Sequence, residues 1–148
     1  WLNMMRDKLG LFGEDKNDKN LINELFDWME KNKVDYTNTF CHLMNINSDE
    51  VYKNKDFINW KNKWKKRSKL NNSTKEKQIE LMKKNNPVVI PRNHKVEEAL
   101  DEADKGSLDK MNKLLNVLRY PYSNNGNLNE FQKLPPASEK NYKTFCGT

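Results

Sequence analysis

Apolar residues recur at helical spacing along almost the whole chain, and this regularity constrains the fold more than any other feature. One stripe lies on a single side of a helix that should begin near Asp15 or Asp18, with separations of one, three and four residues. Its members are Leu21, Ile22, Leu25, Phe26 and Met29. No alternation of apolar and polar residues indicates a sheet. We therefore predict an all-α fold, a compact helical region with bundle-like packing.

The helices are separated by residues that start or stop them. Gly10 and Gly106 follow periodic stretches and predict helix ends. Asn86-Pro87 predicts another end, because proline disfavours helical geometry in the residue before it. Further helices are expected to begin at residues that can cap a helix N-terminus. These are Asp35 or Thr37, Ser48, Ser73 (with Glu76 in a capping box), Asn93 and Ser107.

The two ends of the chain differ in pattern. Helical periodicity stops before Lys133, and Pro135-Pro136 follows. We expect a helical region over residues 1–132 and an extended tail over residues 133–148 that carries Cys146. The first residue is Trp rather than Met, which suggests a processed product or a piece of a longer protein.

Composition excludes several classes of protein. The 148 residues are enough for one domain. No apolar run approaches the roughly 18 residues of a membrane span, and no signal-peptide pattern is present. The two cysteines, Cys41 and Cys146, cannot form a disulfide framework. We therefore expect a reducing, cytoplasmic location and no membrane partner.

Positive charge is concentrated in one segment. The formal charge of the chain is +6, and residues 53–69 hold eight basic residues and one acid. The candidate basic patch consists of Lys61, Lys63, Lys65, Lys66 and Arg67. Together with two tryptophans it could bind nucleic acid, through phosphate contacts and base stacking. However, Phe57, Trp60 and Trp64 share one helix side, which favours an amphipathic helix with buried indoles.

The sequence offers little for metal or thiol catalysis. Zinc sites usually contain ligands two or so residues apart, and Cys41, His42, His94 and Cys146 lack such a pair. We therefore expect no metal site in this chain. A nucleophile–base pair of Cys146 and His94 is possible in principle, but no oxyanion-hole signal accompanies it.

Two short segments are more specific than an ordinary surface. In the first, Pro87 and Pro91 frame an extended link that ends in Arg92, Asn93 and His94. The Arg92 guanidinium is placed to brace backbone carbonyls or a nearby carboxylate. In the second segment, Cys146 lies three residues from the end, where an exposed thiol suits exchange or oxidation chemistry. Both segments also allow a purely structural or incidental interpretation.

Taken together, these segments resemble the C-terminal end of the selenoprotein O family of protein adenylyltransferases. The matching words occur in the family's order and at about its spacings. They are Lys8–Leu11, Asp35–Thr37 with Phe40 and Leu43, Trp60–Arg67, Asn86–His94, Pro121-Tyr122, Pro135-Pro136 and Thr144–Thr148. The most specific are Asn86-Pro87 with Ile90–His94, and the ending that contains Cys146.

The resemblance implies a parent enzyme with a protein-kinase-like fold that transfers AMP from ATP to Ser, Thr or Tyr, using Mg²⁺ or Mn²⁺. The family's nucleotide-binding and catalytic residues precede this portion. No glycine-rich loop, Lys–Glu pair or metal-binding Asp motif matches here. We therefore expect no catalytic residue and no cofactor in this chain. Its partners would be the parent's kinase-like core and, through it, protein substrates.

The resemblance also assigns Cys146 a redox-regulatory role, through a disulfide with a cysteine of the kinase-like core. Asn86, Pro87, Pro91, Arg92, Asn93 and His94 would be structural family-motif residues. Cys41 stands where relatives commonly carry a basic residue, so it is a departure from the pattern. The alternative function is a free-standing basic helical module that binds nucleic acid, and buried Trp60 and Trp64 would count against it.

Overall fold

The computed structural model describes residues 1–70, 73–123 and 128–135. Within these ranges the chain forms helices joined by turns and one extended link, without a strand, and the all-α prediction is confirmed. The helices are α1 (Leu2–Lys8), α2 (Asp18–Asn32), α3 (Tyr36–Leu43), the 3₁₀ helix η1 (Glu50–Lys53), α4 (Lys55–Lys69), α5 (Lys75–Asn85), α6 (Asn93–Asp104), α7 (Asp109–Leu118) and α8 (Asn129–Gln132). No helix in the described part is long and apolar enough to cross a membrane.

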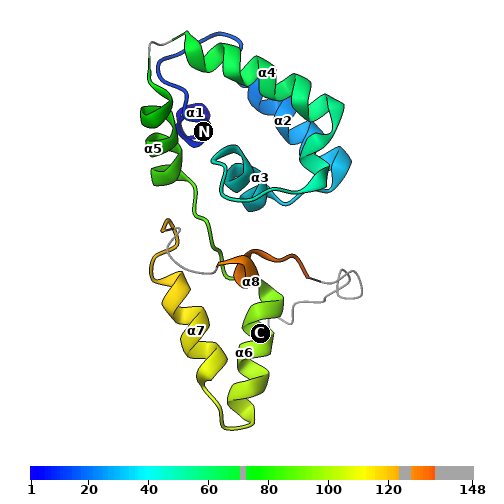
Figure 1. Ribbon diagram of the computed structural model, residues 1–148, viewed down its shortest axis with the longest axis vertical. Helices are drawn as coiled ribbons and strands as arrows, with labels where there is room; N and C mark the ends of the chain where they lie inside the picture. The colour runs from blue at the N-terminus through cyan, green and yellow to red at the C-terminus, as the bar shows by residue number, and fades with distance from the viewer. Residues whose placement is uncertain (71–72, 124–127, 136–148) are drawn as a thin grey trace.

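The hydrophobic core lies among α1 to α5. Helices α2 and α4 run side by side, α1 packs against α5, and α3 lies between these pairs (Figure 1). The predicted stripe of α2 faces inward, and Ile22 and Leu25 are completely buried. Met5, Leu9, Phe40 and other apolar residues from the remaining helices complete the same cluster. The bundle-like packing expected from the stripes therefore holds for this part of the chain.

The aromatic side of α4 is buried against α2 and the α1 terminus. Phe57, Trp60 and Trp64 are 0%, 3% and 7% exposed. The Trp60 indole N–H donates to the Leu21 carbonyl at 2.8 Å, and that of Trp64 donates to the Leu9 carbonyl at 2.9 Å. Since a buried indole N–H needs an acceptor, these bonds allow both tryptophans to lie inside the fold.

The close approach of α1 to α5 depends on Gly10. This residue ends α1 in the left-handed region, with φ +65°. A Cβ at this position would lie 2.8 Å from the Gln78 backbone carbonyl oxygen of α5. Glycine therefore supplies both the turn and the space that the packing requires.

Helices α6 and α7 form a hairpin that extends away from the α1–α5 core (Figure 1). Gly106 makes the turn between them, with φ +92°, as the sequence predicted. Ala99 and Leu114 are buried between the two helices. Leu108 and Leu115 remain 58% and 46% exposed, so the described residues leave these apolar side chains of the hairpin uncovered.

Several predicted helix starts are wrong by one residue. Helices η1, α5 and α6 are preceded by Asp49, Thr74 and Arg92 rather than by the expected neighbours Ser48, Ser73 and Asn93. The Ser73 hydroxyl instead accepts a hydrogen bond from the Gln78 amide. Leu108, not Ser107, occupies the cap position of α7. The side-chain preference marks the turn, but local hydrogen bonding decides which residue occupies the cap.

The start of α3 agrees with the prediction from the sequence, and the start of α2 does not. Asp35 caps α3 as predicted, by accepting a hydrogen bond from the Asn38 N–H at 2.8 Å. For α2, Asn17 holds the cap position and neither Asp15 nor Asp18 caps the helix in the expected way. Asp18 lies buried inside the first turn, where arginines of α1 and α4 engage its carboxylate. Helix α8 ends at Gln132, whereas Cys146 and most of the expected tail lie outside the described residues.

Candidate functional site around the Asn86–His94 segment

Asn86 connects the end of α5 to the end of α1. Its side-chain amide is buried and donates to the Lys8 carbonyl and the Met82 carbonyl, both at 2.8 Å. In return, the Lys8 ammonium donates to the Asn85 carbonyl at 2.9 Å. The bonds to the Lys8 and Asn85 carbonyls satisfy groups that a helix end leaves without backbone partners, whereas the Met82 carbonyl also accepts from the Asn86 backbone N–H. Asn86 is therefore a structural joint between two helices.

The extended link after Asn86 is held from both sides. Val88 and Val89 are almost completely buried, while Pro87 is half-buried and Pro91 is exposed. The Val88 N–H donates to the Pro121 carbonyl at 2.7 Å, and the Val88 carbonyl accepts from the Gln132 side chain at 2.9 Å. The link thus joins the core to the segments that follow α7 and contain α8.

Arg92 forms a two-pronged ion pair with Asp35. Arg92 Nη1 and Nη2 each donate to one oxygen of the Asp35 carboxylate at 3.0 Å. Nη2 also donates to the Asn38 amide oxygen at 3.3 Å. Burial alone would raise the pKa of Asp35, but the hydrogen bonds from Arg92 and from the Asn38 N–H outweigh it and lower that pKa. The pair ties the start of α6 to the start of α3.

The last two residues of the motif lie at the surface. Asn93 is exposed and His94 is half-buried, both in the first turn of α6. Asn93 does not cap this helix, because Arg92 holds the cap position. The segment as a whole therefore connects α1, α3, α5, α6 and α8, and its geometry does not assemble an acid–base or nucleophilic site.

A second buried charge cluster lies at the other end of the core. The Asp18 carboxylate is completely buried and accepts hydrogen bonds from Arg6 Nε at 2.7 Å and from Arg67 Nε at 2.6 Å. Arg67 also donates to the Phe12 and Gly13 carbonyls. Burial would raise the pKa of Asp18, but the bonds from Arg67 and Arg6 outweigh it and lower that pKa. Arg67 is therefore an internal brace, and its expected place in an open basic patch is wrong.

The remaining basic patch residues do not surround an exposed aromatic platform. Lys63 pairs with Glu24 at 2.8 Å, and Lys65 and Lys66 are exposed. The Lys61 ammonium lies 3.5 Å from His42 Nε2. Because Trp60 and Trp64 are buried and hydrogen-bonded, base stacking on them is excluded, which removes the main support for the nucleic-acid alternative.

The cysteine within the described ranges is not a reactive thiol. Cys41 is completely buried. Burial, with the negative charge of Asp35, raises the pKa of its thiol to about 11. A thiol in this state is inert because the thiolate is the nucleophile. The described residues also contain no group of three or more His, Cys, Asp or Glu that could hold a metal ion.

The sequence reasoning missed the importance of Asp18 and Arg6. A signal was present, because Asp18 lies on the same helix side as Leu21, Ile22 and Leu25, three and four residues before the first two. A carboxylate on a buried stripe requires a cationic partner. The sequence could not indicate which arginines supply it.

The chain is similar in sequence to a known protein family. A family model described as "Protein adenylyltransferase SelO" matches residues 1–119. The chain is 57% identical to a protein of Pelagibacter ubique (strain HTCC1062), 47% to one of Clostridium perfringens (strain SM101) and 42% to one of Nitrosococcus oceani. All three are named "Protein nucleotidyltransferase YdiU", and each alignment covers the whole chain.

The chain spans about a third of the length of these relatives, 31% in each of the three. The matched range contains Gly10, Asp18, Asp35, Asn86 and Arg92, which carry the helix packing and the two buried ion clusters. The chain belongs to the SelO family of protein adenylyltransferases.

Proposed function

We propose that this chain is the helical C-terminal portion of a protein adenylyltransferase and that it supports the parent's kinase-like core. In the complete enzyme, a Ser, Thr or Tyr hydroxyl oxygen would attack the α-phosphorus of ATP. AMP would be joined to the side chain, pyrophosphate would leave, and the hydroxyl proton would be lost. The match to the family over residues 1–119 carries this proposal.

The chain itself is proposed to be non-catalytic. Among the five glycines of its sequence, only Gly10 and Gly13 lie close together, and they do not form a glycine-rich phosphate-binding motif. The motif residues that match the family, Asn86 and Arg92, are engaged in internal hydrogen bonds. ATP and Mg²⁺ or Mn²⁺ would therefore be bound by the other two-thirds of the parent.

The uncovered side of the α6–α7 hairpin is the surface that we propose contacts the kinase-like core. Leu100, Leu108 and Leu115 are each at least 45% exposed, and Tyr120 is 72% exposed. Large exposed apolar side chains are typical of interfaces when they gather on one surface, and we propose that these residues do so on the hairpin. The bracing by Arg92 and Asn86 would fix the hairpin's position relative to the α1–α5 core.

Cys146 is proposed as a redox handle that forms a disulfide with a cysteine of the kinase-like core. The support is its place in the ending Thr144–Thr148, which resembles the family's C-terminus. The inert state of Cys41 leaves Cys146 as the better candidate among the two cysteines.

Transfer of labelled nucleotide tests the proposed function. The full-length parent and the 148-residue chain are each incubated with labelled ATP, Mg²⁺ or Mn²⁺ and a generic protein acceptor. Labelled UTP, GTP and CTP are run beside ATP, because the relatives are named nucleotidyltransferases. We expect transfer from ATP by the parent and none by the chain. Transfer by the chain would overturn the non-catalytic assignment, and absence of transfer by the parent would overturn the proposed activity.

The docking role is tested in the parent by a matched pair of α7 variants. Leu115→Asp introduces a charge on the exposed apolar side, and Asn116→Asp introduces the same charge at the next, exposed position. We expect the first variant to lower the parent's melting temperature and transfer rate, and the second to leave both unchanged. Equal behaviour of the two variants would contradict docking through this side of α7.

A further inference from the structure

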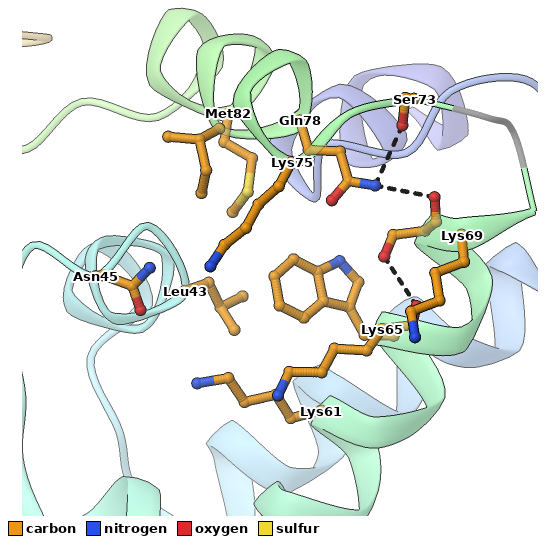
Figure 2. Close-up of a pocket in the computed structure, with 12 residues that line it drawn as sticks. Leu43, Asn45, Lys61, Lys65, Lys69, Ser73, Lys75, Gln78 and Met82 are labelled. Carbon is orange, nitrogen blue, oxygen red and sulfur yellow. Dashed lines mark hydrogen bonds between the residues drawn. The ribbon is translucent and has the colours of Figure 1, made fainter.

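A pocket of about 470 Å³ lies where the end of α3, the outer side of α4 and the start of α5 meet. Figure 2 shows Lys61 and Lys65 extending into it from α4 and Lys75 from α5, with Asn45 and Leu43 at one end. Trp64, Ile79 and Met82 contribute an apolar floor, and Lys69, Ser73 and Gln78 line the other end. We call this the lysine pocket.

The charges of α4 are divided between two sides of the helix. On the side that faces α2, Lys63 pairs with Glu24 and Arg67 pairs with Asp18. On the side that faces the lysine pocket, Lys61, Lys65 and Lys69 follow one another at four-residue intervals. Like charges at this spacing repel each other and destabilise a helix. The fold therefore neutralises one side of α4 and leaves the other side positive.

The four lysines of the pocket have no anionic partner in the described part of the chain. Among those residues the pocket lining contains no Asp or Glu, and no ion pair involves Lys61, Lys65, Lys69 or Lys75. Burial and, after it, the positive charge of Lys65 lower the pKa of Lys61, because both disfavour its ammonium form.

We propose that the lysine pocket binds the oligophosphate group of a small molecule. Lysine ammonium groups bind phosphate as point charges, and four of them match a di- or triphosphate better than a single carboxylate. The Ser73 hydroxyl and the Gln78 and Asn45 amides add polar groups to the lining. The volume of about 470 Å³ lies in the range of small-molecule sites, so the ligand is either an inorganic oligophosphate or a nucleotide.

The lysine pocket is lined by residues of α3, α4 and α5 and by Asn45 and Ser73 in the loops beside them, so its binding can be tested on this chain alone. It therefore stands or falls independently of the proposed enzymatic activity. It also differs from a nucleic-acid surface, because the pocket is limited in size and its tryptophan forms part of the floor rather than an exposed stacking platform.

Isothermal titration calorimetry of the 148-residue chain at low salt, without divalent metal, tests the proposal. The probes are inorganic pyrophosphate and ADP, which carry the same number of phosphoryl groups. We expect one saturable site that weakens as salt is added. Tighter binding of ADP identifies a nucleotide as the source, and equal binding identifies the phosphate chain alone as the determinant. Lack of saturable binding of either probe overturns the proposal.

A matched pair of double variants locates the site. Lys65→Gln with Lys75→Gln removes two exposed pocket lysines, one from α4 and one from α5. Lys66→Gln with Lys83→Gln removes the same charge from the same helices outside the pocket. Since a charge-assisted hydrogen bond contributes about a tenfold factor in affinity, we expect at least a tenfold loss for the first variant. We expect less than a twofold loss for the second variant.

Circular dichroism melting checks that both double variants remain folded, and all four positions are exposed. Equal losses of affinity in the two variants would show that only net charge matters and would overturn the assignment to the lysine pocket. No loss in the first variant would do the same.

Discussion

Replacing Asp18 by Asn should destabilise the chain more than any other loss of a single charge. The Asp18 carboxylate is completely buried between two guanidinium groups, at 2.7 Å from Arg6 Nε and 2.6 Å from Arg67 Nε. An amide of the same shape can accept from one arginine but leaves two buried positive charges facing each other. Breaking a buried ion pair in this way costs about 3–5 kcal/mol.

We expect about 3 kcal/mol, the lower end of that range, because the Asn side chain keeps one hydrogen bond and Arg6 keeps its contact with Glu14 at 3.0 Å. A domain of this kind has roughly 5–15 kcal/mol of stability, so the loss is a large fraction of the total. With a urea dependence of about 1–3 kcal/mol per molar, the unfolding midpoint should fall by about 1–3 M. Tryptophan fluorescence follows the transition, because Trp60 and Trp64 are buried in the same core.

Glu24→Gln is the matched control, because it removes a negative charge from the same helix. Its ion pair with Lys63 is exposed, and such pairs contribute about 0–1 kcal/mol. Adding Arg67→Met to Asp18→Asn should destabilise by less than the sum of the two single changes, since it removes one of the stranded charges. If Asp18→Asn shifts the midpoint no more than Glu24→Gln does, the argument from buried charge is refuted.

Three further outcomes are expected. Stability should be full near neutral pH and fall below about pH 4, because Asp18 and Asp35 have lowered pKa values in the folded state and lose their contribution as they become protonated. Urea unfolding midpoints measured from pH 7 to pH 3 test this prediction. An unchanged midpoint at pH 3 contradicts it. Gly10→Ala should destabilise the fold by more than Gly106→Ala does. Both changes carry the left-handed strain of roughly 1–2 kcal/mol, but a Cβ meets the α5 backbone only at Gly10. Equal melting temperatures of the two variants would refute the packing argument. The Cys41 thiol should not react with a disulfide reagent at pH 8 until urea is added, because burial raises its pKa to about 11. The measurement uses a chain in which Cys146 is replaced by serine. Rapid reaction without urea would contradict the burial of Cys41.

The periodic pattern predicted the helices well because it reports local geometry. The α2 stripe, the inward side of α4 and the ends at Gly10, Asn86 and Gly106 all follow from the chemistry of neighbouring residues. Helix starts were less accurate, since several residues in a row can cap a helix and contacts from elsewhere select among them. Asp18 shows this most clearly, because it exchanges a local cap for two distant arginines.

The sequence indicated the candidate site only through the short motif of residues Asn86–His94. The sequence indicates that Arg92 can brace a carboxylate, but it does not indicate which one. The partner is Asp35, which lies 57 residues away in the chain. The same limit applies to the basic segment, whose sequence predicts a single patch. In the fold, Arg67 is buried, Lys63 is paired, and Lys61 and Lys65 face a pocket with Lys75.

The sequence by itself determined the all-α class, the inward side of each core helix and the family to which the motifs belong. These properties depend on residue spacing and on short words, which do not require knowledge of what each helix contacts. The tertiary structure alone decided which charges are neutralised and which are not. Pairing between charges depends on which helix sides meet, and the packing of α4 against α2 on one side and beside α5 on the other sets that outcome.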